Sequence, residues 1–219
     1  ITLMPIQIDE GFFSDAPTVE RYPKEMYFRL LCGEILPKEL KRVLYLDPDM
    51  LIINSLLPLW ELDLEDNLLA AASHTGLGNI VSGINNIRLD IDHNYFNSGV
   101  MLIDLVKARE IIKLSDINEL IQKKGRYLLL PDQDVLNYLY GKYIKEIPEE
   151  VWNYDARKFT SYLAKSKAEF DIPWVIKNTA ILHFCGKPKP WQQYSDTLFT
   201  ALYLAYARQK NLLLENKNL

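Results

Sequence analysis

A short apolar run that ends in two carboxylates and then resumes is the feature that most constrains this chain. Residues 43–46 read as a buried strand, Asp47-Pro48-Asp49 follows directly, and residues 50–53 are apolar again. In an α/β sheet, the carboxyl end of such a strand faces the crevice where ligands bind. Asp47 and Asp49 are two residues apart, and a bend at Pro48 lets both carboxylates converge on one cation. The same residues also suit a plain surface turn.

Strand-like and helix-like segments alternate along the whole chain. Apolar runs predict strands over residues 43–46, 50–53, 68–73, 95–105, 143–147 and 179–184. Helical spacing predicts helices over residues 22–36, 106–124, 131–140 and 195–210. Loops are expected over the Gly- and Asn-rich residues 74–86 and over residues 152–154. The alternation predicts one α/β domain over residues 1–219, with a mixed, mostly parallel sheet flanked by helices.

The composition excludes several classes of protein. A formal net charge of −4 provides no basic field, so nucleic acid is not expected as a partner. The only cysteines, Cys32 and Cys185, lie in apolar sequence, which argues against a disulfide framework and fits a reducing compartment. No apolar run reaches the roughly 18 residues of a membrane-spanning helix, and no signal peptide is visible. We therefore expect a cytoplasmic protein, free or peripheral at the inner face of the membrane.

Arg29 is a charged residue on an otherwise apolar helix face. In the helix expected over residues 22–36, that face also carries Tyr22, Met26, Gly33 and Leu36. Such an arginine either extends its stem to the edge of the apolar surface or meets an anionic partner. Both alternatives stay open from the sequence.

Asn97-Ser98-Gly99 places polar residues at the start of an apolar strand. Glycine in a strand marks a close approach of backbone or ligand, so Asn97 is a candidate ligand contact. A β-bulge capped by Asn97 explains the same pattern equally well.

Asp132-Gln133-Asp134 opens the helix expected over residues 131–140. Carboxylates in a first helical turn are favoured by the helix dipole, and this needs no ligand. However, Asp132 shares a face with Leu136 and Leu139, which should point inward. A carboxylate on a core-facing stripe requires a partner or a substrate.

His183 ends the strand expected over residues 179–184, and a loop with Gly186, Lys187 and Lys189 follows it. A histidine at a strand end is most often structural. Here the flexible backbone and two ammonium groups behind it suit phosphate oxygens. Two Asp oxygens and one imidazole nitrogen, completed by phosphate oxygens, suit Mn²⁺ or Mg²⁺ better than Zn²⁺.

Together these motifs resemble glycosyltransferase family 8, the retaining sugar transferases with a GT-A fold that include bacterial lipopolysaccharide galactosyltransferases and glycogenin. The matching motifs occur in the family's order over nearly the whole chain. They are residues 27–30 (YFRL), 43–49 (VLYLDPD), 95–103 (YFNSGVMLI), 131–137 (PDQDVLN) and 183–191 (HFCGKPKPW).

The resemblance implies a hexosyltransferase that moves glucose or galactose from a UDP-sugar to a glycan or glycolipid acceptor of the lipopolysaccharide type. It implies a Mn²⁺ site, with Mg²⁺ as the alternative cation, on Asp47, Asp49 and His183. It implies contacts to the sugar donor from Arg29, Asp47, Asn97, Asp132, Gln133, Gly186 and Lys189. Asp132 and Gln133 would lie at the reacting carbon as the catalytic residues.

Two features depart from the family pattern. His74 stands where relatives often carry Asp, and it is either an acceptor contact or an exposed loop residue. The chain opens with Ile1, and its first elements read like the middle of an α/β domain. We therefore expect the first nucleotide-binding strand and helix of the family, roughly 60 residues, to be absent from it.

Retention of anomeric configuration allows two routes. A covalent route needs a close carboxylate as nucleophile, and Asp132 is the candidate, with Gln133 a poor nucleophile beside it. The other route is same-face attack guided by the leaving group, which we favour. The motifs do not choose the donor epimer, the acceptor or the oligomeric state.

Two rival functions belong to other classes. An aspartyl-phosphate phosphohydrolase also places Asp-x-Asp after an apolar strand, but it favours Thr or Val after the second Asp, where Met50 stands here. A non-catalytic sugar-nucleotide-binding domain would keep the fold without turnover. The three intact ligand residues argue against it.

Overall fold

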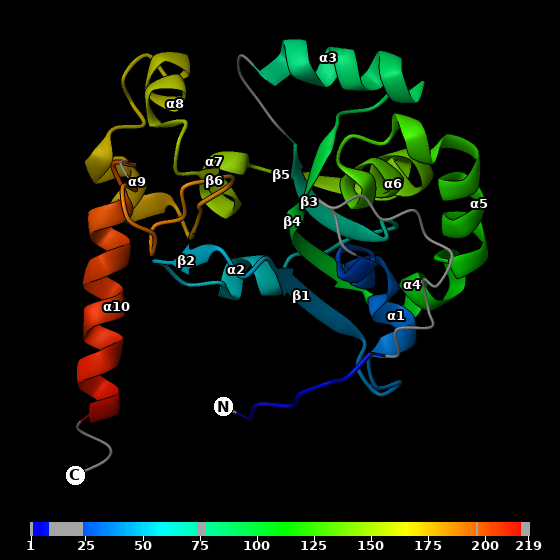
Figure 1. Cartoon of the computed structure of the whole chain (residues 1–219), viewed down its shortest axis with the longest axis horizontal. Coiled ribbons are helices and arrows are strands. Elements are labelled where there is room, and N and C mark those ends of the chain that lie inside the picture. The colour runs from blue at the N-terminus through cyan, green and yellow to red at the C-terminus, as the bar shows by residue number, and fades with distance from the viewer. Residues whose placement is uncertain (1, 9–23, 74–77, 196, 216–219) are drawn as a thin grey trace. The chain divides into compact units, whose positions relative to one another are not determined.

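A computed structural model describes residues 2–8, 24–73, 78–195 and 197–215 (Figure 1). The described residues form two compact units, which are treated separately below. The first unit comprises Ile1–Tyr45, Asp63–His74 and Ile80–Glu146, and the second comprises Leu46–Leu62, Thr75–Asn79 and Ile147–Leu219. The single domain expected over residues 1–219 stays a prediction.

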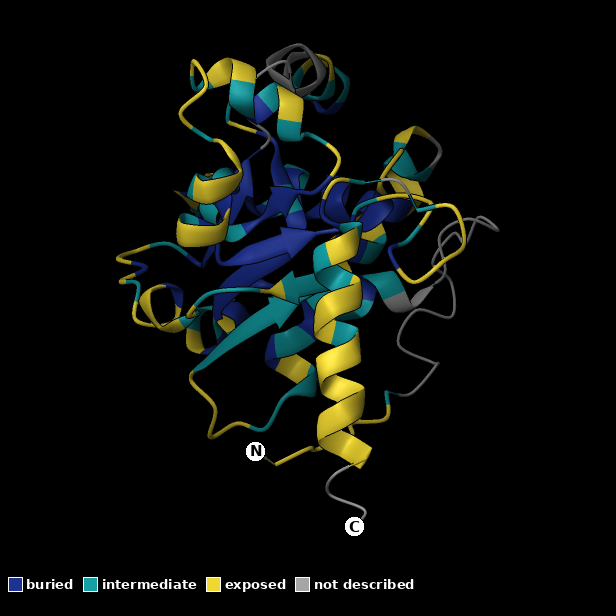
Figure 2. Ribbon diagram, turned by 90° about the vertical axis from the view of Figure 1, so that its left-hand side faces the viewer, coloured by how far each residue is buried: buried dark blue, intermediate teal, exposed yellow. Residues whose placement is uncertain are grey.

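In its described residues, the first unit contains a four-stranded sheet in the order β1-β4-β3-β5. Its strands are β1 (Arg42–Leu46), β4 (Phe96–Asp104), β3 (Leu69–Ser73) and β5 (Ile144–Ile147). The two central strands are antiparallel, with Leu69 opposite Ile103. Every residue of β3 is buried, as is most of β4 (Figure 2). This continuous burial explains why both strands are apolar along their whole length.

Helices cover this sheet and complete the core of the first unit. They are α1 (Cys32–Ile35), α3 (Gly78–Leu89), α4 (Leu105–Ile111), α5 (Leu114–Lys124) and α6 (Pro131–Tyr140), with 3₁₀ turns at Lys24–Leu31, Gly125–Tyr127 and Gly141–Tyr143. Gly33 allows α1 to approach α4 closely, because a Cβ there would lie 3.1 Å from the backbone nitrogen of Arg109. The buried core runs from Tyr27 and Leu31 to Val135 and Leu136.

The second unit contains a small sheet with β7 (Ile181–His183) between β2 (Met50–Ile52) and β6 (Tyr154–Asp155). β7 pairs antiparallel with β2 and parallel with β6. The helices of this unit are α2 (Leu57–Trp60), α7 (Glu149–Trp152), α8 (Phe159–Lys165), α9 (Ile172–Asn178) and α10 (Thr200–Glu215). Its core is aromatic, with the ring centroid of Tyr154 at 4.3 Å from that of Tyr162 and 5.7 Å from that of Phe199. Mixed sheets flanked by helices confirm the predicted α/β class.

Several predicted elements are confirmed within a few residues, including β3, β4, β5, β7 and α6. The helix expected over residues 195–210 is observed at Thr200–Glu215. Residues 152–154 were expected in a loop, whereas Trp152 ends α7 and Tyr154 begins β6. None of the helices in the described ranges combines the length and the apolar character that a membrane crossing requires.

Two predictions of local structure are wrong. Residues 106–124 form two helices and not one, because buried Ile112 adopts an extended backbone (φ −82°, ψ 120°) between α4 and α5. Residues 74–86 were expected as a loop, but α3 begins at Gly78 and continues to Leu89. Its last turn carries Arg88, which forms an ion pair with Asp134 of α6. The local composition favours a loop and does not predict this tertiary contact.

Asn137 joins α6 to the first residue of β4. Its side chain is fully buried, and its Oδ1 accepts from the backbone nitrogen of Phe96 (2.7 Å). Its Nδ2 donates to the carbonyl of Phe96 and to that of Gln133, both at 2.8 Å. One amide therefore satisfies both backbone groups at the strand start and fixes the helix that carries Asp132 and Gln133.

We expect Asn137→Ala to lower the free energy of unfolding by about 3 kcal/mol, because it leaves buried backbone groups without partners. The matched control is Asn178→Ala, which removes a partly buried bond to the carbonyl of Trp174 and should cost less than about 1 kcal/mol. Urea denaturation measures both values. Equal losses in the two variants would contradict this role of Asn137.

Candidate functional site

Asp47, Asp49 and His183 converge in the second unit. Asp47 follows β1 directly, and the β2–β7 register places Met50 opposite His183, so Asp49 lies beside the imidazole. The Nε2 of His183 is 3.2 Å from Asp49 Oδ1 and 3.9 Å from Asp47 Oδ2. One ligand atom from each of the three residues lies within 4.8 Å of the others. The turn at Pro48 therefore brings the carboxylates together, as the sequence predicted.

Asn153 orients the imidazole of His183. Its Oδ1 lies 2.8 Å from the Nδ1 of His183, and both side chains are buried. With Nδ1 donating to this amide, Nε2 points toward the two carboxylates. A ligating histidine is commonly fixed in this way by a second partner. The sequence analysis missed Asn153, and its only signal was a polar residue between Trp152 and Tyr154 in an aromatic segment.

Lys189 brings a second positive charge to Asp49. Its ammonium contacts Asp49 Oδ2 and donates to the carbonyl of Phe184 (2.9 Å). Gly186, in the loop between them, has φ +73°, a conformation that other residues rarely adopt. Both oxygens of Asp49 therefore face a cationic side chain.

These contacts shift the protonation of both partners. Burial favours the neutral form of Asp49, but the hydrogen bonds from His183 and Lys189 outweigh it and hold the pKa of the carboxyl well below its usual range. Burial also disfavours charge on His183, yet its interactions with Asp49 and Cys185 outweigh burial and raise the pKa of the imidazole to about 10. His183 is therefore protonated at neutral pH beside two carboxylates.

The residues fit a divalent cation. Two carboxylate oxygens and one neutral imidazole nitrogen form a ligand set that Mn²⁺ and related ions accept. Metal binding would replace the imidazole proton and the ammonium of Lys189 as the positive charges next to Asp49. This is the one group of three or more such ligands found within the described residues.

A second polar cluster lies in the first unit, around Arg29. Its Nε is 3.2 Å from Asp132 Oδ2, and its Nη1 donates to the hydroxyl of Ser98 (3.2 Å). The Ser98 hydroxyl in turn donates to Asp132 Oδ2 (3.0 Å). The guanidinium also lies 4.9 Å from the ring centroid of Tyr45. Of the two alternatives for Arg29, the structure favours an anionic partner, which is Asp132.

Gln133 completes this cluster. Its Oε1 accepts from Asn97 Nδ2 (3.0 Å) and from the backbone nitrogen of Ser98 (3.2 Å). Its Nε2 is buried and has no hydrogen-bond partner in the part of the chain that the structure describes. Asn97 Oδ1 also accepts from the nitrogen of Gly99 (2.8 Å), so the predicted capping role is observed beside the contact to Gln133. A buried N–H group without a partner is a natural contact for a ligand oxygen.

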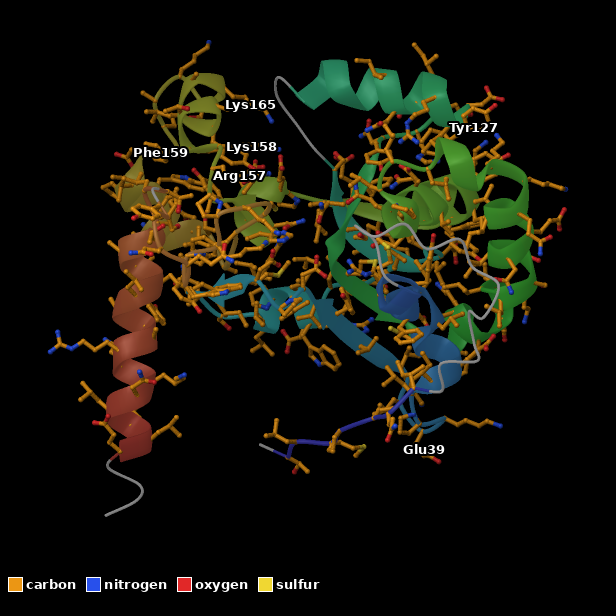
Figure 3. All side chains as sticks on the ribbon, viewed as in Figure 1. Glu39, Tyr127, Arg157, Lys158, Phe159 and Lys165 are labelled. Atoms are coloured by element: carbon orange, nitrogen blue, oxygen red, sulfur yellow. The ribbon has the colours of Figure 1, made fainter. Side chains whose placement is uncertain are left out.

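Asp134, next to Gln133, is fully buried and satisfied by the protein. Arg88 donates to both of its oxygens (2.6 and 2.9 Å), and the hydroxyl of Tyr95 donates to Oδ1 (2.5 Å). Arg88 also donates to the carbonyl of Tyr127 (2.8 Å), whose side chain is labelled in Figure 3. This network fixes the start of α6. Arg88 stands in none of the sequence motifs, and Tyr95, although it begins the motif over residues 95–103, was not predicted as a site residue.

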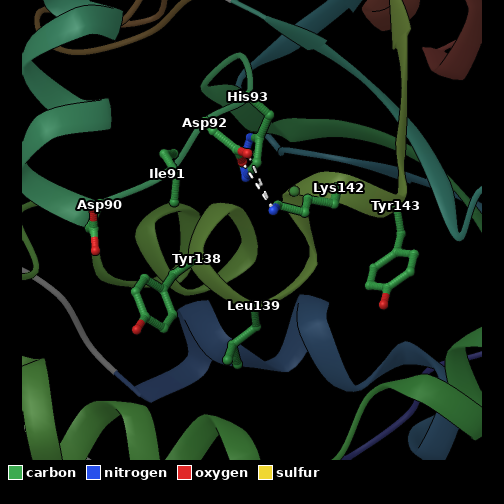
Figure 4. A pocket seen from close by; sticks show the side chains of 9 residues that line it. Asp90, Ile91, Asp92, His93, Tyr138, Leu139, Lys142 and Tyr143 are labelled. Carbon is green, nitrogen blue, oxygen red and sulfur yellow. Dashed lines mark hydrogen bonds and ion pairs between the residues drawn. The ribbon is translucent and has the colours of Figure 1, made fainter.

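Of the remaining predicted residues, His74 lies outside the described residues. A cavity of about 590 Å³ lies elsewhere in the first unit, near the end of α6, and contains none of the predicted site residues. An ion pair between Lys142 and Asp92 (3.2 Å) lies beside it (Figure 4). Its lining consists of Asp90, Ile91, Asp92, His93, Tyr138, Leu139, Gly141, Lys142 and Tyr143.

Known proteins from several bacteria have sequences similar to this chain. The chain is 28% identical to general stress protein A of Bacillus subtilis over 216 residues, covering 93% of this chain and 72% of the relative. It is 30% identical to a lipopolysaccharide 1,2-glucosyltransferase of Escherichia coli over 200 residues, covering 86% of this chain and 56% of the relative. It is 25% identical to glycosyltransferase GlyF of Streptococcus pneumoniae over 205 residues, covering 94% of this chain and 47% of the relative. The chain thus spans about half the length of the last two.

Solved structures of glycosyltransferases are also similar to this chain. The galactosyltransferase LgtC, in complex with donor and acceptor sugar analogues, superposes with a TM-score of 0.75 at 25% identity, covering 93% of this chain and 74% of LgtC. Glycosyltransferase GlyE of Streptococcus pneumoniae gives a TM-score of 0.62 at 25% identity, covering 86% of this chain and 43% of GlyE. The expected GT-A fold is confirmed. The model of glycosyl transferase family 8 matches residues 5–195, and the chain belongs to that family.

Proposed function

We propose that this chain transfers a hexose, glucose or galactose, from a UDP-sugar to a glycan or glycolipid acceptor with retention of configuration, and that Mn²⁺ is its cation, with Mg²⁺ as a substitute. The convergence of Asp47, Asp49 and His183, with Lys189 beside them, carries the proposal. A bound divalent cation would supply Lewis-acid stabilisation to the departing diphosphate. The two free cysteines, Cys32 and Cys185, are consistent with a cytoplasmic location.

Lys189 and Gly186 are proposed to bind the diphosphate. When the bond between the sugar and the phosphate breaks, negative charge grows on the leaving oxygen. The ammonium of Lys189 can move from Asp49 to that oxygen, because a cation at Asp49 replaces it there. Gly186 has a positive φ and no side chain, so its backbone could lie next to the diphosphate.

The cluster around Arg29 is proposed to hold the transferred sugar. The free Nε2 of Gln133 is available to a sugar oxygen, and Asn97 is fixed next to it. Asp132 Oδ2 is shared by Arg29 and Ser98, which makes it a weak nucleophile. We therefore favour same-face attack: the acceptor oxygen bonds to the anomeric carbon, the bond to phosphate breaks, and the hydroxyl proton passes to the leaving phosphate oxygen.

The sharpest test of this function is turnover of UDP-glucose and UDP-galactose with Mn²⁺, measured as release of UDP. Wild-type protein should turn over one of them. The rate of UDP release should be at least about tenfold lower in Asp49→Asn, because this change removes a charge from the cation site. Asp66→Asn, a change at an exposed carboxylate, should keep full activity. Hydrolysis of an aryl phosphate without UDP-sugar turnover would instead identify a phosphohydrolase.

The raised pKa of His183 predicts how metal binding depends on pH. With a pKa of about 10, the imidazole stays protonated from about pH 6 to pH 8 and must lose one proton for each cation bound. The logarithm of the Mn²⁺ association constant, measured with UDP present, should therefore rise by about one for each pH unit. In His183→Gln this slope should disappear. A wild-type affinity that levels off above about pH 7 would contradict the raised pKa, and a slope that persists in His183→Gln would contradict His183 as a ligand.

A further inference from the structure

Arg157 is held in place by a buried carboxylate. Asp155, at the end of β6, is 2% exposed, and its two oxygens accept from the Nε (3.0 Å) and Nη2 (2.8 Å) of Arg157. The backbone nitrogen of Arg157 donates to the same carboxylate (3.0 Å). A guanidinium bound along one edge in this way has a fixed orientation.

This anchor lies one strand away from the proposed cation site. The parallel pairing of β6 with β7 places Asp155 opposite His183, and the nitrogen of Ala156 donates to the carbonyl of His183 (3.0 Å). The guanidinium of Arg157 then lies against the loop after β7. A Cβ added to Gly186 would be 2.5 Å from the Nη1 of Arg157.

The Nη1 group of Arg157 has no hydrogen-bond partner among the described residues, and the side chain is 49% exposed. Asp155 does not need Arg157 only as a counter-charge, since Lys158 also lies near it (3.6 Å between Nζ and Oδ2). Figure 3 labels Arg157 and Lys158 on the segment before α8. An oriented guanidinium with one free edge suits a phosphate oxygen better than a mobile lysine does.

We propose that Arg157 is a further phosphate-binding residue of this site, with its Nη1 donating to a phosphate oxygen of the sugar donor's diphosphate beside Gly186. This inference rests on the proposed function, because it takes the loop after His183 to be the diphosphate loop. It adds a residue from β6 and its following turn to a site otherwise built from the β1–β2 turn and that loop.

The test compares binding of UDP and uridine, by calorimetry with Mn²⁺ fixed, to wild type, Arg157→Lys and Arg157→Ala. Arg157→Lys keeps a cation for Asp155 but loses the free edge. Both variants should bind UDP about tenfold more weakly and uridine unchanged, since one charge-assisted contact is lost. Lys165→Ala removes an exposed charge at the other end of α8 and should bind UDP like wild type.

Arg157→Lys binding UDP as tightly as wild type would overturn the inference, because Arg157 would then serve only Asp155. Equal losses for UDP and uridine would also overturn it, since the contact would not be to phosphate. Unchanged UDP binding with a higher KM for the acceptor would place Arg157 on the acceptor instead. If wild type itself failed to bind UDP, the proposed function would fail. Melting temperatures of each variant exclude loss of fold as the cause.

Discussion

The charge on Asp49 is the constraint on which the second unit depends. Burial and a second carboxylate disfavour the charged form of Asp49, and cations next to it favour that form. His183 and Lys189 supply them, and they tie β7 and the loop after it to the turn between β1 and β2. The same arrangement includes two of the three proposed ligands of a divalent cation, Asp49 and His183. Binding and stability would therefore share two side chains, Asp49 and His183.

The parts of the site that the sequence predicted are those set by short-range geometry. Asp47 and Asp49 are two residues apart at a proline turn after a strand, and His183 ends another strand. An apolar pattern predicts where a strand ends, and the side chains at two strand ends come together once the strands pair. Asp132 was predicted to need a partner because helical spacing placed it on the core-facing stripe, and it is 5% exposed beside Arg29.

The parts that the sequence could not provide depend on long-range contacts. Residues 74–86 were expected as a loop, yet α3 begins at Gly78, and Arg88 in its last turn bonds to the fully buried Asp134, 46 residues away. Asn153 is 30 residues from the imidazole that it orients. Neither pairing has a local pattern, because a side chain's partner is set by tertiary packing and not by its neighbours in the chain.

Asp47, Asp49 and His183 are proposed to hold a divalent cation for which Lys189 competes at Asp49. The most direct measurement is the affinity of Lys189→Met for Mn²⁺ without nucleotide, against wild type and against Lys187→Met, a change at an exposed lysine of the same loop. Removing the competing ammonium should strengthen Mn²⁺ binding by about tenfold, about 1.4 kcal/mol, with no change in Lys187→Met. An affinity that is unchanged or weaker in Lys189→Met would contradict the account.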